Sequence, residues 1–153
     1  LMLLAPGVSV KKCVGNIFCT VTNETLTHNP SLQDRVIKPQ FPLARPLFGS
    51  ALLYNAHMSW KKKLSVPSLV FVAGLEEDKY VHSEDLILWA DKMNGTFNSD
   101  IVTVHCASAK HELDNEPHKY GGAQVRQASV QYFESLIDNT PFILNEGPCL
   151  KLH

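Results

Sequence analysis

The chain has 153 residues, of which 44% are hydrophobic and 19% are charged, and its formal net charge is -1. This length and composition are typical of one globular domain, or of one piece of a larger domain, and they argue against an intrinsically disordered chain. The nearly balanced charge leaves no electrostatic footprint for DNA or RNA, so we expect no nucleic-acid partner. No run reaches the roughly 18 apolar residues that a membrane-spanning helix needs.

The first part of the chain predicts a strand and then a long irregular segment. The apolar run LMLLAP at residues 1–6 is typical of a buried parallel strand, which Pro6 and Gly7 would end. Residues 10–48 show no clear periodicity and contain prolines at 30, 39, 42 and 46, which indicates short helices at most. Because position 1 is not Met and the chain opens within a strand, we expect that it was cut from a longer protein.

From residue 50 onward the sequence predicts helices alternating with strands. The first helix would span 50–63, with Ser50 as its N-cap and an apolar face through Leu53, His57 and Trp60. The run VPSLVFVAG at 66–74 predicts a second buried strand.

The second half of the chain continues this alternation. A helix would begin at the N-cap Ser83 and stop at Asn94 and Gly95, and DIVTVHC at 100–106 predicts a third strand. A last helix over 122–138 would bury one face, made of Val125, Ala128, Tyr132, Phe133, Leu136 and Ile137. The tail at 138–153 would be loosely held. This order predicts an α/β fold, with a parallel sheet flanked by helices.

Two strand exits carry the titratable residues that indicate chemistry. Asp78 follows the strand at 66–74, and His111 follows the strand at 100–106. The carboxyl ends of parallel strands meet at one edge of a sheet, so these side chains could meet there. A carboxylate beside an imidazole fixes the histidine tautomer and stabilises the imidazolium that forms when the ring takes a proton from a nucleophile. Taken one by one, such an aspartate is more often a turn former and such a histidine is more often solvated.

Three stretches of the chain resemble the C-terminal part of α/β-hydrolases of the lysophospholipase and monoacylglycerol lipase type: VPSLVFVAGLEEDKYV, AKHELDNE and VRQASVQYFESL. LMLLAP, LTHNP and FGSALLYNAHMSW extend the likeness upstream, where they resemble the strand before the cap and the return from the cap to the core. The resemblance implies a partial α/β-hydrolase fold over 1–137, with 10–49 as part of the cap (lid) insertion and 50–137 as core.

By the same resemblance, Asp78 and His111 are the acid and the base of a Ser-Asp-His triad that hydrolyses a lysophospholipid, a monoacylglycerol or a similar carboxylic ester. Glu76 and Glu77 are alternatives to Asp78, since three adjacent acids leave the register open, and Glu112 is a less certain helper. Phe18, Phe41, Leu47 and Phe48 are candidate lining of an acyl pocket beneath the lid, although ordinary core packing is the better explanation for any one of them.

The nucleophile of such an enzyme sits on a G-x-S-x-G turn between a strand and a helix, and this chain lacks that motif. Ser9 follows a strand but has Lys11 in place of the last glycine, and Ser50 fits a helix cap better. We therefore expect the serine and the oxyanion hole on a missing N-terminal half of the fold, and this chain alone to be inactive.

Other interpretations stay open. The chain could be a non-catalytic α/β-hydrolase remnant that serves as a binding or interaction module, with an exposed sheet edge for a partner. Metal binding through His105, His111 and His118 is a third alternative, but their spacing matches no ligand signature, so we expect no metal and no cofactor.

The cysteines and two glycosylation motifs bear on the compartment of the protein. The four cysteines form no C-x-x-C pair and read best as free buried thiols, which favours the cytosol. The triplets at 23–25 and 94–96 would permit glycosylation in a secretory context. We expect a cytoplasmic or membrane-peripheral protein that contacts a membrane through the lid.

Overall fold

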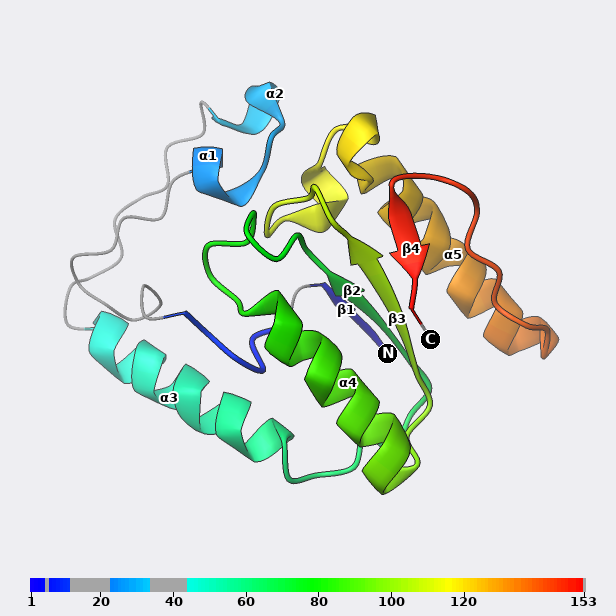
Figure 1. The fold of residues 1–153 in the computed structure, drawn as a ribbon, viewed down its shortest axis with the longest axis horizontal. Helices are drawn as coiled ribbons and strands as arrows, with labels where there is room; N and C mark the ends of the chain where they lie inside the picture. The colour runs from blue at the N-terminus through cyan, green and yellow to red at the C-terminus, as the bar shows by residue number, and fades with distance from the viewer. Residues whose placement is uncertain (5, 12–22, 34–43, 153) are drawn as a thin grey trace.

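The computed structural model describes residues 1–4, 6–11, 23–33 and 44–152. Its elements in chain order are β1 (Met2–Leu4), α1 (Asn23–Leu26), α2 (Pro30–Gln33), α3 (Ala44–Ser59), β2 (Ser68–Val72), α4 (Ser83–Phe97), β3 (Ile101–Cys106), the 3-10 helices η1 (Leu113–Asn115) and η2 (His118–Tyr120), α5 (Gly122–Asp138) and β4 (Cys149–Lys151). Figure 1 shows the sheet at the centre, with α3 and α4 to its left and front. None of the helices in these ranges is long and apolar enough to cross a membrane.

The described sheet has the strand order β1-β2-β3-β4. The first three strands are parallel, with Leu4 beside Phe71 and Phe71 beside Val104, and β4 joins β3 in the antiparallel sense. All five residues of β2 are buried, because the strand has neighbours on both edges and helices on both faces. The sheet is therefore mostly parallel and belongs to the α/β class, as the alternation of strands and helices predicts.

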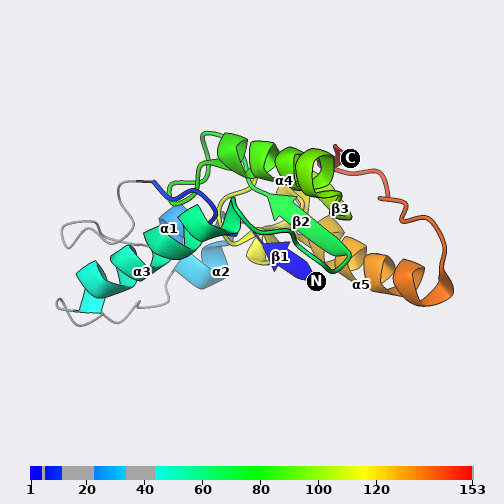
Figure 2. The same cartoon turned by 90° about the horizontal axis from the view of Figure 1, so that it is seen from below.

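Two helices cover opposite faces of this sheet, α4 on one side and α5 on the other (Figure 2). Alternate residues of the strands divide between the two cores because successive side chains point to opposite faces. The core toward α5 includes Leu69, Phe71, Val104, Val125 and Tyr132. The core toward α4 includes Val70, Val72, Leu86, Trp89 and Met93.

Helix α3 differs from its prediction in where it starts and in which face it buries. It begins at Ala44, so Ser50 lies inside the helix and is not its N-cap. Ala56 is buried, whereas Leu53 and His57 are exposed. Trp60 follows the helix and donates its indole N–H to the carbonyl of Val8, at 3.0 Å. Over residues 50–59, where the side chains of α3 are described, the helix therefore buries Ala56 rather than the predicted Leu53 and His57.

Helix α4 also differs from its predicted ends. His82 holds the N-cap position, and Ser83 is the first helical residue, with its hydroxyl donating to the carbonyl of Gly74 at 3.4 Å. The helix continues past Asn94 and stops at Asn98, which adopts the left-handed conformation with φ 51°. Asn94 does not end the helix because its side-chain amide pairs with both the N–H and the carbonyl of Ile101 at the start of β3.

The predicted buried face of α5 holds only in the first part of the helix. Val125, Ala128 and Tyr132 are buried, but Phe133, Leu136 and Ile137 are 44%, 42% and 82% exposed. Figures 1 and 2 show the reason, since the C-terminal end of α5 runs out beyond the sheet and has no strand beneath it.

The tail is more firmly held than the prediction of a loose segment. Cys149 and Cys106 form a disulfide, with their Cα atoms 4.1 Å apart, and β4 pairs with β3 beside it. The side chain of Gln124 on α5 accepts from the Cys149 N–H and donates to the Cys149 carbonyl. Free thiols are therefore the wrong interpretation for these two cysteines, and Cys13 and Cys19 lie outside the described residues.

Candidate functional site

The loops after β2 and β3 lie against each other at the upper edge of the sheet in Figure 1. The N–H of Gly74, in the first loop, donates to the carbonyl of Ala109, in the second, at 2.9 Å. A Cβ on Gly74 would stand 2.2 Å from the carbonyl oxygen of Ala107, so only glycine allows this approach. Parallel pairing of β2 with β3 thus brings the loop of Asp78 to the loop of His111.

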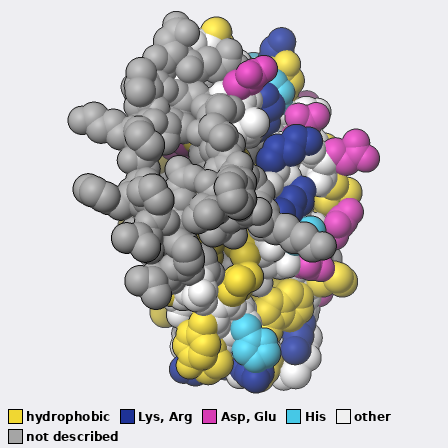
Figure 3. All heavy atoms as spheres, turned by 90° about the vertical axis from the view of Figure 1, so that its left-hand side faces the viewer, with side chains coloured by type: hydrophobic (Ala, Val, Ile, Leu, Met, Phe, Trp, Pro, Cys, Tyr) yellow, Lys and Arg dark blue, Asp and Glu magenta, His cyan; other side chains and the backbone are white. Residues whose placement is uncertain are grey.

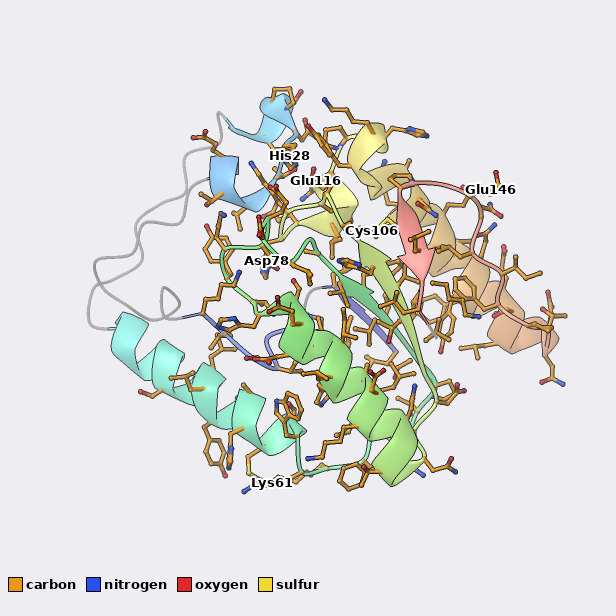
Figure 4. The ribbon with its side chains drawn as sticks, viewed as in Figure 1. His28, Lys61, Asp78, Cys106, Glu116 and Glu146 are labelled. Atoms are coloured by element: carbon orange, nitrogen blue, oxygen red, sulfur yellow. A yellow bond between two sulfur atoms is a disulfide. The ribbon has the colours of Figure 1, made fainter. Side chains whose placement is uncertain are left out.

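These two candidate residues are in direct contact. Nδ1 of His111 lies 2.9 Å from Oδ2 of Asp78. The Asp78 side chain is fully buried, whereas that of His111 is 29% exposed. The arrangement therefore hides the carboxylate and leaves part of the imidazole open to solvent. Figure 4 shows Asp78 above the strands, on the loop that follows β2.

The second oxygen of Asp78 is bound by the backbone of its own loop. Oδ1 accepts from the N–H of Tyr80 at 2.8 Å and from the N–H of Val81 at 3.0 Å. Burial acts to raise the pKa of this carboxyl, but the hydrogen bond and charge of His111 and the two backbone N–H groups outweigh burial and lower the pKa. Asp78 is therefore ionised at neutral pH, and an ionised carboxylate only accepts, so Nδ1 of His111 carries the donated proton.

Tyr80 and Lys11 complete the surroundings of the pair. The ring of Tyr80 meets the imidazole of His111 edge to face, with centroids 5.2 Å apart. Its hydroxyl bonds the hydroxyl of Thr25 on α1, and the ammonium of Lys11 donates to the backbone carbonyl of Asp78. The dyad is thus supported by residues of the N-terminal part of the chain, Lys11 and Thr25, as well as by the loops after β2 and β3.

The neighbouring acids do not take the place of Asp78. Glu76 is exposed, and the carboxylate of Glu77 faces His28 at 3.8 Å. The carboxylate of Glu112 accepts from the side chain of Asn115 at 2.9 Å. Of the acids considered from the sequence, Asp78 is the one placed on the His111 imidazole.

Several other sequence candidates lie elsewhere. Ser9 donates its hydroxyl to Asp85 at 2.5 Å, which pairs it with a carboxylate rather than an imidazole. Burial lowers the pKa of His105 on β3, against the opposing hydrogen bond to Ala73, and His118 is exposed on η2. The described ranges contain no group of three or more His, Cys, Asp or Glu residues that could hold a metal ion. Phe18 and Phe41 lie outside those ranges, and for Leu47 and Phe48 only the backbone of α3 is described.

One well-built feature escaped the sequence analysis, a second histidine–carboxylate pair. Nδ1 of His28, between α1 and α2, lies 2.9 Å from Oε2 of Glu116, whose side chain is fully buried. In Figure 4, His28 and Glu116 lie beside each other above Asp78. Nothing in a single sequence marks a contact between residues 88 positions apart. The one signal available in the sequence was Glu116 itself, an acidic residue five positions after His111.

The surface near the site carries mixed charge. In the part of the face in Figure 3 that is not grey, acidic and basic side chains lie intermixed, so neither sign dominates that part. A separate pocket of about 490 Å³ lies at the C-terminal segment, lined by residues 142–147 and 149–151. None of its lining residues belongs to the loops of Asp78 and His111, so it is distinct from the dyad.

A buried, ionised carboxylate that orients a partly exposed imidazole can move a proton to and from a third group. The carboxylate holds Nδ1 in its protonated form and leaves Nε2 to accept the proton of a nucleophile. Comparisons with family models, with curated proteins and with solved structures found no match for this chain. The geometry of the dyad is therefore the feature from which a function can be proposed.

Proposed function

We propose that this chain supplies the acid and the base of a Ser-Asp-His triad in a serine hydrolase of the α/β-hydrolase fold. Its substrate would be a carboxylic ester of the lysophospholipid or monoacylglycerol class. The observation that supports the proposal is the 2.9 Å contact between Nδ1 of His111 and the fully buried carboxylate of Asp78. The support from sequence is the resemblance of residues 67–137 to that group of enzymes.

The mechanism assigns one role to each atom of the dyad. Nε2 of His111 accepts the proton of a serine hydroxyl as its oxygen attacks the ester carbonyl, and Asp78 stabilises the imidazolium that forms. The imidazolium then gives this proton to the leaving alkoxide, which departs as an alcohol and leaves the acyl-serine. In the second half, Nε2 takes a proton from water, the hydroxide attacks the acyl group, and the proton returns to the serine as the fatty acid leaves.

In this proposal the serine and the oxyanion donors come from the N-terminal half of the fold, outside the described residues. Ser9, the one candidate that follows a strand, is paired with Asp85 instead. The pairing of Ser9 with Asp85 also favours a second candidate function, in which the chain is a non-catalytic remnant that works as a binding module. The two differ in whether an activated serine exists in the complete gene product.

Residues 10–49 would form part of a lid over the acyl chain, and Thr25 on α1 bonds the hydroxyl of Tyr80, whose ring packs against His111. For its location we propose the cytoplasm or the periphery of a membrane. Disulfides such as Cys106–Cys149 are typical of oxidising compartments, and this weighs against the cytosolic alternative.

The test is labelling of the complete gene product with a fluorophosphonate probe, which reacts with activated serines. We expect labelling that His111→Ala abolishes, because the serine then has no base. His118→Ala is the matched control, since His118 is exposed on the same segment, and it should label like the wild type. Absence of labelling in a folded wild-type protein would refute the enzyme and leave the binding module.

A further inference from the structure

The side chain of Glu116 is fully buried, although carboxylates are rarely buried without partners. Its Oε1 accepts from the backbone N–H of His28 at 3.0 Å and of Lys110 at 3.4 Å, and its Oε2 lies 2.9 Å from Nδ1 of His28. The carboxylate therefore joins residues 24–29, called the cap segment below because they fall within the expected cap insertion, to both ends of the loop that contains His111.

The ring of His28 is held on three sides. It stacks on Tyr120 with centroids 3.9 Å apart and an interplanar angle of 21°. Its Nε2 faces the carboxylate of Glu77 at 3.8 Å, and Glu77 is the residue before Asp78. One side chain from the cap thus meets the acid loop through Glu77 and the histidine loop through Glu116.

Further bonds extend this contact along the whole segment. The N–H of Glu112, the residue after His111, donates to the carbonyl of Leu26 at 2.9 Å. The side chains of Thr27 and Asn29 both donate to the carbonyl of Asn115. Residues 24–29 therefore run along the outside of the His111 loop and hydrogen-bond to it repeatedly.

We propose that His28 and Glu116 form a positioning pair that holds the loop of His111 in register with the loop of Asp78. A buried polar contact contributes little net stability compared with an apolar pair of the same volume, and its best-attested use is to specify one geometry. Here the geometry specified is that of the two loops whose tips must place an imidazole on a carboxylate. The inference rests on the proposed function for its catalytic consequence, but the positioning itself can be measured without any reaction.

The first experiment uses the 153-residue chain and NMR. The proton between Nδ1 of His111 and Asp78 should give a downfield resonance that His111→Ala removes, which assigns it. His28→Leu removes the contact with Glu116, and His28→Asn keeps an amide near the place of Nδ1. His118→Leu is the control. Hydrogen exchange at the N–H of Glu112, which bonds Leu26, reports in parallel whether the cap segment stays docked.

We expect His28→Leu to weaken or remove the His111 resonance and to speed exchange at Glu112. His28→Asn should restore both, and His118→Leu should change neither. If His28→Leu speeds exchange at Glu112 while the His111 resonance stays unchanged, the pair only docks the cap and the inference fails. If His28→Leu does not fold, failure of the folded His28→Asn protein to retain the resonance would overturn it equally.

The second experiment measures ester hydrolysis in the complete gene product. Displacing a catalytic group by about 1 Å can cost on the order of 100-fold in rate, so we expect His28→Leu to lower kcat by about 10- to 100-fold with little change in KM. A rise in KM with kcat unchanged would show a substrate-binding role instead. A wild-type product without activity would sink the proposed function, while the NMR result would still decide whether the pair positions His111.

Discussion

The clearest prediction separates the structural role of Asp78 from its chemical role by comparing Asp78→Ala with Asp78→Asn. In the wild type the buried carboxylate satisfies three groups, namely the N–H of Tyr80, the N–H of Val81 and Nδ1 of His111. Alanine leaves both buried N–H groups unpaired. At about 1–3 kcal/mol for each unsatisfied group, Asp78→Ala should lower the free energy of unfolding by about 2–6 kcal/mol.

Asparagine should cost much less, because its carbonyl oxygen can still accept from Tyr80 and Val81. The change replaces a charge-assisted bond to His111 by a neutral one, for a loss of about 1–2 kcal/mol. The amide NH₂ then donates to Nδ1, which moves the ring proton to Nε2. A ring protonated at Nε2 cannot accept a proton from serine, so the complete enzyme should lose on the order of 10⁴-fold in kcat.

Urea unfolding and long-range ¹H–¹⁵N correlation spectra of the histidine rings measure the two effects. Equal stability of Asp78→Ala and wild type would refute the hydrogen-bond argument, and an unchanged His111 tautomer in Asp78→Asn would refute the chemical one. The lowered pKa of Asp78 adds a pH signature. Its stabilisation should be complete above the ordinary value of 3.8 and be lost as pH falls through the folded pKa, so the gap between wild type and Asp78→Asn should close in that acid range.

Three further predictions concern other buried groups. Burial, and to a lesser extent Asp100, raises the pKa of Tyr132 to about 12, and its hydroxyl has no hydrogen-bond partner among the described residues. Tyr132→Phe should therefore leave stability unchanged or raise it by up to about 1 kcal/mol, and should remove one late step from the ultraviolet titration of tyrosine. Burial lowers the pKa of the half-buried His105, so the free energy of unfolding should fall as pH drops below 6.5 toward the folded pKa. The urea midpoint of His105→Leu should not show this fall. The disulfide between Cys106 and Cys149 spans 43 positions, so its reduction should lower the free energy of unfolding by about 4 kcal/mol. Labelling of Cys106 and Cys149 by a thiol reagent in unfolded, unreduced protein would contradict the bridge.

Local sequence patterns predicted the strands and the class of the sheet, because these features depend on residues close together in the chain. The apolar runs at 1–6 and 66–74 predicted two buried parallel strands, and the alternation with helices predicted a mostly parallel sheet. Both strands form, but only β2 is fully buried, whereas β1 is half-buried because in the described sheet it pairs with β2 alone. Parallel strands end at one edge, so the proximity of the loops of Asp78 and His111 also followed from strand order. These features depend on periodicity and direction, which a single sequence contains.

Contacts between distant residues were beyond this reasoning. The burial of α3 through Ala56, the end of α4 at Asn98 and the exposure of Ile137 depend on which surface each helix meets. The docking of the tail depends on Cys149 meeting Cys106. In each case local propensity allowed more than one outcome, and packing chose among them.

The sequence by itself determined the class of the fold and the two loops from which a dyad could be built, because strand direction and residue type are local properties. Only the tertiary structure decided that Asp78, rather than Glu76 or Glu77, contacts the imidazole. The backbone N–H groups of Tyr80 and Val81 hold the Asp78 carboxylate inside the loop, and the sequence does not show which of the three acids they bind. Only the tertiary structure placed His28 on Glu116, because 88 residues of chain must fold back before a buried carboxylate can meet its partner.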